Sequence, residues 1–271
     1  MVEHDDHVGM MLDKLDELGI ADNTIVIYST DNGAEPWTWP DGGQTRFRGA
    51  KSNNWEGDHR APLMVRWPGT VEPGTIYNDI ISHLDWMPTL AAAAGEPDLV
   101  AKMKKGYRAG KKTWKVHLDG YNFVPYFKGE AAAGPRENYL YWGMDGALNA
   151  VRWRDFKAHF NFQVGPANPF KGSHMVTPNA PLIFNLRADP FERAQTDSGA
   201  WENFAIDQMW LFVPLQQVIG AFVATIPEYP FQMGSSLSAS NINYDLFRRA
   251  DAMKRLEETQ NELTRLRSGS K

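Results

Sequence analysis

The stretch Ile25-Val26-Ile27-Tyr28-Ser29-Thr30-Asp31-Asn32-Gly33 decides the fold class of this chain. A β-branched and aromatic run that stops at Asp-Asn-Gly predicts a buried strand ending in a turn. In α/β sheets, ligands bind at the carboxyl ends of the strands, which is where Asp31 and Asn32 fall. Their carboxylate and amide oxygens suit calcium or magnesium better than zinc. The same residues also make a good turn on their own chemistry, so the turn alone does not require a metal.

Apolar patterns on both sides of this strand indicate an α/β unit. Residues 2–18 carry apolar side chains at helical spacing. A second short buried strand is predicted over Pro62–Gly69, and a helix over Ser82–Ala94 with Ser82 or Asp85 as its cap. Between the two strands, residues 33–60 are rich in Gly, Trp, Asn and Arg without a period, which is typical of a long functional loop.

The second part of the chain has a different texture. Short aromatic runs separated by turn residues predict an antiparallel sheet of three or four strands, with one further strand later on. These runs are Asn138–Trp142, Ala147–Arg152, Phe156–Phe162 and, later, Leu182–Leu186. An apolar helix is predicted over 208–224 and a charged amphipathic helix over Tyr244–Arg267. The basic stretch Lys102–Lys115 is interpreted as a solvated loop. The predicted domains are 1–98 and 99–271.

Composition excludes several classes of function. The chain has 271 residues and a net charge of −5, which argues against a nucleic-acid partner. We expect no membrane span, because no apolar run approaches the length that a spanning helix needs. The absence of cysteine excludes disulfides, thiolate metal sites and cysteine nucleophiles. The first residues are acidic and polar, unlike a secretory signal, and the compartment stays open.

Lys51 is the candidate anion-binding residue. It lies among glycines and small polar residues, downstream of the Asp31–Asn32 turn. A lone lysine in a loop is usually a solvated surface residue, but this setting can place a point charge on a phosphate or sulfate oxygen. His59 and His83 could serve as bases, although single histidines without a spaced partner are more often structural.

Taken together, the ordered motifs closely resemble the arylsulfatase family of the alkaline-phosphatase-like superfamily. They are Thr30-Asp31-Asn32-Gly33, Lys51, Trp55-Glu56-Gly57, Arg60, Arg66-Trp67-Pro68-Gly69, Asp85-Trp86-Met87-Pro88-Thr89-Leu90 and, more loosely, Phe184 to Glu192. The resemblance implies part of a doubly wound α/β sheet, followed by a smaller antiparallel sheet with packed helices. Residues 1–98 would then be the C-terminal portion of the catalytic domain, and 99–271 a C-terminal subdomain.

The resemblance also assigns roles. Asp31 and Asn32 would be two of the calcium ligands, Lys51 would hold a sulfate oxygen, and Trp55, Glu56 and Arg60 would support the site. The family's nucleophile is a formylglycine made in a Cys/Ser-x-Pro-x-Arg motif, and this sequence contains no such motif. The family's two N-terminal aspartate ligands have no counterpart either, so the calcium set is incomplete. The resemblance is thus to the C-terminal portion of a sulfatase.

One residue departs from the family pattern within the matched motifs. Asp58 stands where the pattern usually has a second glycine. We expect its side chain to add negative charge near Lys51 and to require an unfavourable backbone angle.

The function implied is that of a sulfuric ester hydrolase whose nucleophile is not in this chain, with a sulfate ester as the substrate of the intact enzyme. Family members are often periplasmic or secreted. A phosphoric or phosphonic ester hydrolase of the same superfamily is disfavoured, because Asn32 has no neighbouring histidine to help bind two cations. A non-catalytic orphan fragment is the other alternative. The strand over 24–30 predicts an exposed sheet edge and self-association.

Overall fold

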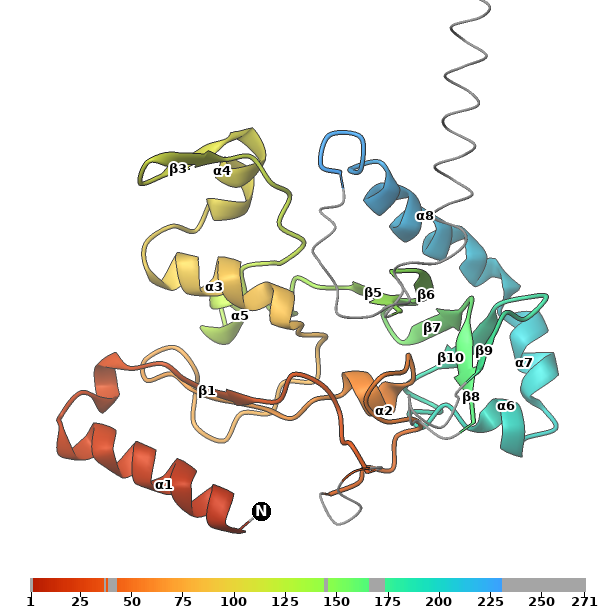
Figure 1. The fold of residues 1–271 in the computed structure, drawn as a ribbon, viewed down its shortest axis with the longest axis horizontal. Helices are drawn as coiled ribbons and strands as arrows, with labels where there is room; N and C mark the ends of the chain where they lie inside the picture. Colours follow the sequence, from red (N-terminus) through yellow and green to blue (C-terminus); the bar gives the residue numbers. More distant parts are fainter. Residues whose placement is uncertain (1, 37, 39–42, 144–145, 166–173, 231–271) are drawn as a thin grey trace, which may run out of the picture. The chain divides into compact units, whose positions relative to one another are not determined.

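The computed structural model describes residues 2–36, 38, 43–143, 146–165 and 174–230 (Figure 1). Met1–Pro230 form one compact unit, and Phe231–Lys271 form a second unit outside the described residues. The helix predicted over Tyr244–Arg267 falls in that second unit.

The predicted first helix and first strand are both present, and this strand pairs with the second predicted strand. Helix α1 spans Val2–Glu17 and strand β1 spans Val26–Ser29. Strand β2, Leu63–Arg66, pairs antiparallel with β1, from Val26 opposite Arg66 to Ser29 opposite Leu63. Both strands are half-buried and Met64 is exposed, so these strands are less buried than their apolar sequences predict. The chain doubles back through the intervening loop, which ends in the short helix α2, Glu56–His59.

The predicted helix over residues 82–94 begins with the expected cap. The hydroxyl oxygen of Ser82 accepts the amide of Leu84, and Asp85 accepts the amide of Ser82, which makes a capping box. The carboxylate of Asp85 is buried and binds the guanidinium of Arg136 at 2.7 and 2.8 Å. The basic stretch Lys102–Lys115 was predicted as a loop, but it contains the end of helix α4, Leu99–Lys105, and a hairpin. The strands of the hairpin are β3, Tyr107–Ala109, and β4, Lys112–Trp114.

The antiparallel sheet predicted in the second part of the chain is confirmed. Its strands are β5 (Asn138–Trp142), β6 (Leu148–Trp153), β7 (Phe156–His159) and β10 (Leu182–Asn185), in the order β10-β7-β6-β5. Helix α8, Phe212–Val223, packs along β6. A core cluster lies between one face of the sheet and the helical segment 209–223. It consists of Val151, Ala158, Ile183, Leu211 and Leu215.

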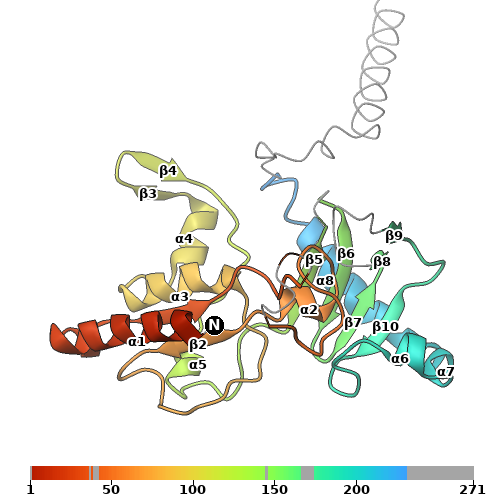
Figure 2. The same ribbon diagram turned by 60° about the horizontal axis from the view of Figure 1, so that its bottom comes forward.

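The other face of the sheet turns toward the loop that carries α2. Trp55 of that loop packs with Phe162 and Phe184 in a second core cluster. Figure 2 shows α2 beside this sheet in a second view. The remaining described elements are η1 Ala21–Asn23, η2 His83–Asp85, α3 Trp86–Ala93, α4 Leu99–Lys105, β3 Tyr107–Ala109, β4 Lys112–Trp114, α5 Val124–Phe127, β8 Phe162–Val164, β9 His174–Val176, α6 Ala194–Asp197, α7 Trp201–Asp207 and η3 Met209–Leu211.

Among the described residues, no single helix combines the length and apolarity needed to cross a membrane. One pair of helical segments, Trp201–Asp207 and Met209–Val223, meets the test jointly by length and composition, with a bend of 48° between them.

Candidate functional site

Two main-chain hydrogen bonds join the Asp31–Asn32 turn to the loop that carries Lys51. The amide of Gly33 donates to the carbonyl of Asp58, and the amide of Lys51 donates to the carbonyl of Ala34 at 3.0 Å. A side chain at Gly33 would place its Cβ 1.8 Å from the carbonyl oxygen of Gly57, so only glycine allows this approach. The structure therefore brings together the predicted metal turn and the predicted lysine loop, two features that lie about twenty residues apart in the sequence.

The loop around Lys51 has an unusual backbone. Ser52 adopts a left-handed conformation with φ 76°, which is uncommon for a residue with a side chain. The amide oxygen of Asn53 accepts the amide of Trp55 at 3.0 Å and closes the turn that follows. Asp58 lies in helix α2 and is not among the described residues with positive φ, so the expected backbone penalty at Asp58 is wrong. The strained position is Ser52.

Lys51 forms an ion pair on the loop surface. Its ammonium nitrogen lies 3.0 Å from Oε2 of Glu35, and 40% of its side chain is exposed. Glu35 raises the pKa of Lys51, and the charges of Asp31 and Asp58 act in the same direction. The expectation that Asp58 adds negative charge near Lys51 is therefore met. Lys51 is charged and accessible, and Glu35 is its partner.

A cleft of about 930 Å³ opens beside the turn. Its polar wall includes Asp31, Asn32, Asp58, His59 and Arg152, whereas Lys51 lies outside the lining. Burial raises the pKa of Asp58 to about 6 and lowers the pKa of His59 to about 4. Among the described residues, neither Oδ1 of Asp58 nor Nε2 of His59 has a hydrogen-bond partner. Burial thus favours the uncharged form of both neighbouring groups in the cleft.

The histidines predicted as candidate bases have different surroundings. His83 lies at the cleft and its Nε2 is 3.1 Å from the carbonyl oxygen of Thr30, which anchors the ring to the end of β1. His59 packs its ring against Tyr139 and Tyr141. The contacts of both rings agree with the structural role that sequence reasoning favoured.

Asp31 and Asn32 are the candidate cation ligands of the turn. Both line the cleft, and the amide nitrogen of Asn32 donates to the carbonyl of Gly33 at 2.8 Å, which leaves its amide oxygen for a cation. These oxygens match the preference of calcium, which takes six to eight oxygen ligands. No group of three or more His, Cys, Asp or Glu residues that could hold a metal occurs in the part of the chain that the structure describes. The two residues fit calcium chemically but form only part of a ligand set.

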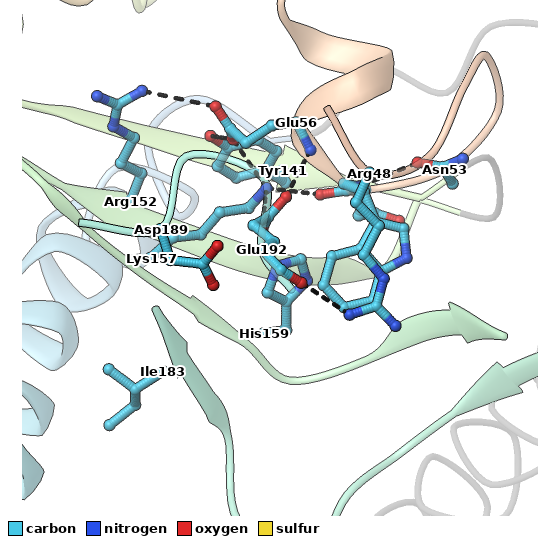
Figure 3. A network of polar contacts seen from close by, with 12 residues as sticks. Arg48, Asn53, Glu56, Tyr141, Arg152, Lys157, His159, Ile183, Asp189 and Glu192 are labelled. Carbon is cyan, nitrogen blue, oxygen red and sulfur yellow. Dashed lines mark hydrogen bonds and ion pairs between the residues drawn. The ribbon is translucent and has the colours of Figure 1, made fainter. Parts of the chain in front are cut away.

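Of the three predicted supporting residues, Trp55 and Glu56 are buried and Arg60 is partly exposed, and both Glu56 and Arg60 line the cleft. Trp55 is 3% exposed and its ring stacks under the guanidinium of Arg48, 3.7 Å away. The carboxylate of Glu56 is 1% exposed and accepts a hydrogen bond from Arg60 at 2.9 Å. Glu56 is the centre of a buried polar network, shown in Figure 3.

The network joins α2 to the four-stranded sheet. The ammonium of Lys157 lies 2.9 Å from Glu56 and 3.1 Å from Glu192, and all three side chains are at most 1% exposed. Tyr141 donates to Glu56 at 2.9 Å, and His159 lies 2.7 Å from Glu192. Burial alone would raise the pKa of Glu56 and of Glu192, but the charge of Lys157 holds the pKa of both below its ordinary value.

Sequence reasoning missed Lys157, His159 and Glu192. The signal that could have found them is the alternation in Phe156-Lys157-Ala158-His159-Phe160. In a strand, Lys157 and His159 share one face, while Ala158 faces the apolar core. A strand with one apolar face and a lysine and a histidine on the other indicates that a charged partner covers the second face.

The chain belongs to the sulfatase family. Residues 1–96 match the Sulfatase family, and residues 134–236 match the C-terminal region of aryl-sulfatase. The chain is 32% identical to the arylsulfatase of Hemicentrotus pulcherrimus, over 71% of this chain and 36% of that protein. It is 28% identical to the human steryl-sulfatase, over 85% of this chain and 40% of that protein. The chain thus spans about two fifths or less of these relatives, and its resemblance to the C-terminal portion of an arylsulfatase is confirmed.

A solved structure gives the same result. The PsFucS1 sulfatase from Pseudoalteromonas sp. superposes with a TM-score of 0.69 at 27% identity, over 86% of this chain and 43% of that one. The predicted fold class, part of an alkaline-phosphatase-like α/β fold followed by an antiparallel sheet, is thereby confirmed. Sulfatases generally depend on a metal and on formylglycine.

Proposed function

We propose that this chain supplies the sulfate clamp and part of the calcium site of an arylsulfatase-type sulfuric ester hydrolase. The observation that carries the proposal is the pair of main-chain bonds that place the Lys51 loop against the Asp31–Asn32 turn. An anion clamp and a cation site must lie side by side to act on one sulfate group. We further propose that residues 1–98 are the C-terminal portion of the catalytic domain and that residues 99–271 are its C-terminal subdomain.

Each residue then has a chemical role. The ammonium of Lys51 offsets negative charge on the sulfate oxygens, at a position where the charge is already in place before the ester reacts. Asp31 and Asn32 would hold calcium, which polarises the sulfate ester when bound. Trp55 and Glu56 support the loop from the interior, and Arg60 donates to the carboxylate of Glu56 from the cleft side. The nucleophile has to come from outside these 271 residues, because the sequence has no Cys/Ser-x-Pro-x-Arg motif.

The test is a titration of the ¹⁵N-labelled chain with sodium sulfate in the presence of calcium, followed by amide and lysine-ammonium NMR signals. The expected result is a saturable shift at Lys51 and at residues 31–33 that is lost in Lys51→Ala. Lys102→Ala is the matched control, because Lys102 is also a surface lysine paired with a glutamate, at 2.8 Å from Glu96. Absence of the shift, or an equal loss in Lys102→Ala, would contradict the proposal. A stronger response to phosphate would favour a phosphoric ester hydrolase instead.

A further inference from the structure

We propose that Lys157 is a positioning residue for the sulfate clamp. Its ammonium contacts the carbonyl oxygen of Asn54 and Oε1 of Glu56 in the loop that carries Lys51 and α2, and Oε1 of Glu192 in the turn after β10. The inference rests on the proposed role of Lys51 as a sulfate ligand. It adds a residue of the antiparallel sheet, far away in the sequence, to the parts on which the geometry of the site depends.

Lys157 makes two hydrogen bonds and one further ion pair in the interior. Its ammonium nitrogen donates to the Asn54 carbonyl at 2.7 Å and to Glu56 at 2.9 Å, lies 3.1 Å from Glu192, and the side chain is 0% exposed. A lysine ammonium has donors and no acceptor, so acceptors of this kind suit it. The contact with Asn54 is made to the main chain only three residues after Lys51, so a shift of this ammonium moves the clamp directly.

The two carboxylates need this cation between them. Glu56 lies on α2, and Glu192 lies in the turn that follows β10; Oε2 of Glu192 also accepts the amide of Glu56 at 2.6 Å. Figure 3 shows Lys157 between the two. Two buried carboxylates this close repel each other strongly unless a positive charge is shared. Arg60 and Arg152 also pair with Glu56, but Lys157 pairs with both carboxylates and so supports the docking of α2 on the turn.

Backbone strain occurs on both sides of this docking. Ser52, next to Lys51, has φ 76°, and Glu192 has φ 53°; both are left-handed conformations that residues with side chains avoid. Such conformations persist only where the surroundings over-determine them. At Glu192 the surroundings are visible: its carboxylate contacts Lys157 and His159, and its carbonyl accepts Arg48 at 2.9 Å.

Helix α2, which Glu56 begins, is also hydrogen-bonded to the loop before Lys51 and to the Asp31–Asn32 turn. The amide of Gly57 donates to the carbonyl of Arg48 at 2.7 Å, and Gly33 donates to the carbonyl of Asp58 on the same short helix. The turn 31–34 is thus held against α2 at one end and against Lys51 at the other. When α2 loses its docking on the sheet, both attachments lose their fixed support.

The experiment measures amide hydrogen exchange in the full chain with Lys157→Met, which keeps the aliphatic stem and removes the charge. The amides of Gly33, Lys51 and Gly57 should exchange at least about tenfold faster, while the amides of β6 change less. Leu211→Ala is the control for simple destabilisation, because Leu211 is 0% exposed and packs on the opposite face of the same sheet. An equal pattern in both variants would overturn the proposal.

A second comparison removes the charge of Glu192. Glu192→Gln alone should speed exchange at the loop amides, because it weakens one acceptor of Lys157. In the Lys157→Met background the same change should slow exchange at these amides, because it removes the repulsion with Glu56. Only a cation shared by the two carboxylates makes Glu192→Gln speed exchange in the parent chain and slow it in Lys157→Met. If the effects of the two substitutions on the exchange rates are additive, the proposal is overturned. If Lys157→Met fails to fold, recovery of folding in the double variant supports the proposal, and failure of both variants to fold contradicts it.

The readout does not depend on sulfate. Selective opening of the loop in Lys157→Met, together with no sulfate response in the parent chain, would retain the positioning of the loop and reject the proposed function. A sulfate response at Lys51 that is unchanged in Lys157→Met would retain the proposed function and reject the positioning role.

Discussion

Nζ of Lys51 and Oε2 of Glu35 lie 3.0 Å apart, so in this structure the candidate sulfate clamp is paired with a carboxylate of its own chain. A sulfate oxygen has to compete with Glu35 for the ammonium. The pair is partly exposed, which makes such competition feasible at modest cost.

Removing this competitor should strengthen anion binding. In Glu35→Gln we expect sulfate to bind about two- to fivefold more tightly, as measured by the shift of the Lys51 ammonium signal, because an exposed ion pair has an effect of that size. Glu130→Gln, at another exposed glutamate, is the control for the change in net charge. Weaker binding in Glu35→Gln would show that Glu35 orients Lys51 rather than competing for it.

The stability of the fold should show compensating pH effects at Asp58 and His59. The pKa of Asp58 is raised to about 6, so its contribution to stability is full below pH 3.8 and is lost as the pH rises through 6. The pKa of His59 is lowered to about 4, so its contribution is full above pH 6.5 and is lost as the pH falls through 4. Between pH 4 and 6 the two trends oppose each other.

Asp58→Asn should remove one of these trends. Relative to the parent chain, we expect this variant to gain about 1–2 kcal/mol of stability between pH 4 and pH 6.5, after allowance for the partial exposure of Asp58. Urea unfolding at several pH values measures the difference, and His59→Gln should change it in the opposite direction. A difference that is constant across this pH range would contradict the raised pKa of Asp58.

The isolated chain should hydrolyse no aryl sulfate. Positioning and electrostatics have no nucleophile to act on here, because the 271 residues include no cysteine and no Ser-x-Pro-x-Arg motif. The assay is release of a chromogenic phenol from an aryl sulfate in the presence of calcium. Turnover that survives repurification and disappears in Lys51→Ala would refute this prediction.

Calcium should bind weakly, if at all. Asp31 and Asn32 provide one formal negative charge and at most three side-chain oxygens, whereas calcium takes six to eight oxygen ligands. Isothermal titration of calcium into the parent chain is the measurement. Micromolar or tighter binding that Asp31→Ala abolishes would show that further ligands exist beyond these two.

The part of the fold that sequence predicted best is the antiparallel sheet, because its strands are short aromatic runs separated by turn residues, a pattern set by neighbours in the chain. The direction of pairing between β1 and β2 could not be derived in the same way. The run Ile25–Tyr28 is equally apolar whether its partner is parallel or antiparallel, and the partner is chosen by the long loop between the strands.

The sequence predicted the candidate residues at the surface of the site but not the buried residues that support them. Asp31, Asn32 and Lys51 stand in motifs with recognisable spacing. Lys157 and Glu192 are separated from them by about a hundred residues or more and look locally like solvated charges. Their burial depends on opposite charges that come from different parts of the chain: Lys157 pairs with Glu56 and Glu192, and Arg60 also pairs with Glu56. Only the tertiary structure shows this pairing.

The two-stranded β1–β2 sheet should be the least protected sheet structure and the point of self-association. Within the described residues each of these strands has a single partner, both are half-buried, and Met64 is 61% exposed. A two-stranded sheet has marginal stability, and its open edges can pair with another chain. By contrast, Val151 and Ala158 in the four-stranded sheet are 0% exposed. Hydrogen exchange should therefore be fast at residues 24–30 and slower in the strands between residues 138 and 190.

Association is tested by sedimentation velocity at several protein concentrations. We expect the mean mass to rise with concentration in the parent chain and to rise less in Met64→Lys, because a lysine on an exposed strand discourages edge pairing. The β6 amides should keep their protection in this variant, which separates loss of association from unfolding. Asn23→Lys, at an exposed position outside either strand, adds the same single positive charge and is the control. A monomer at all concentrations, with the amides of Val26–Ser29 among the best protected, would contradict both the open edge and the weak pairing that the structure indicates.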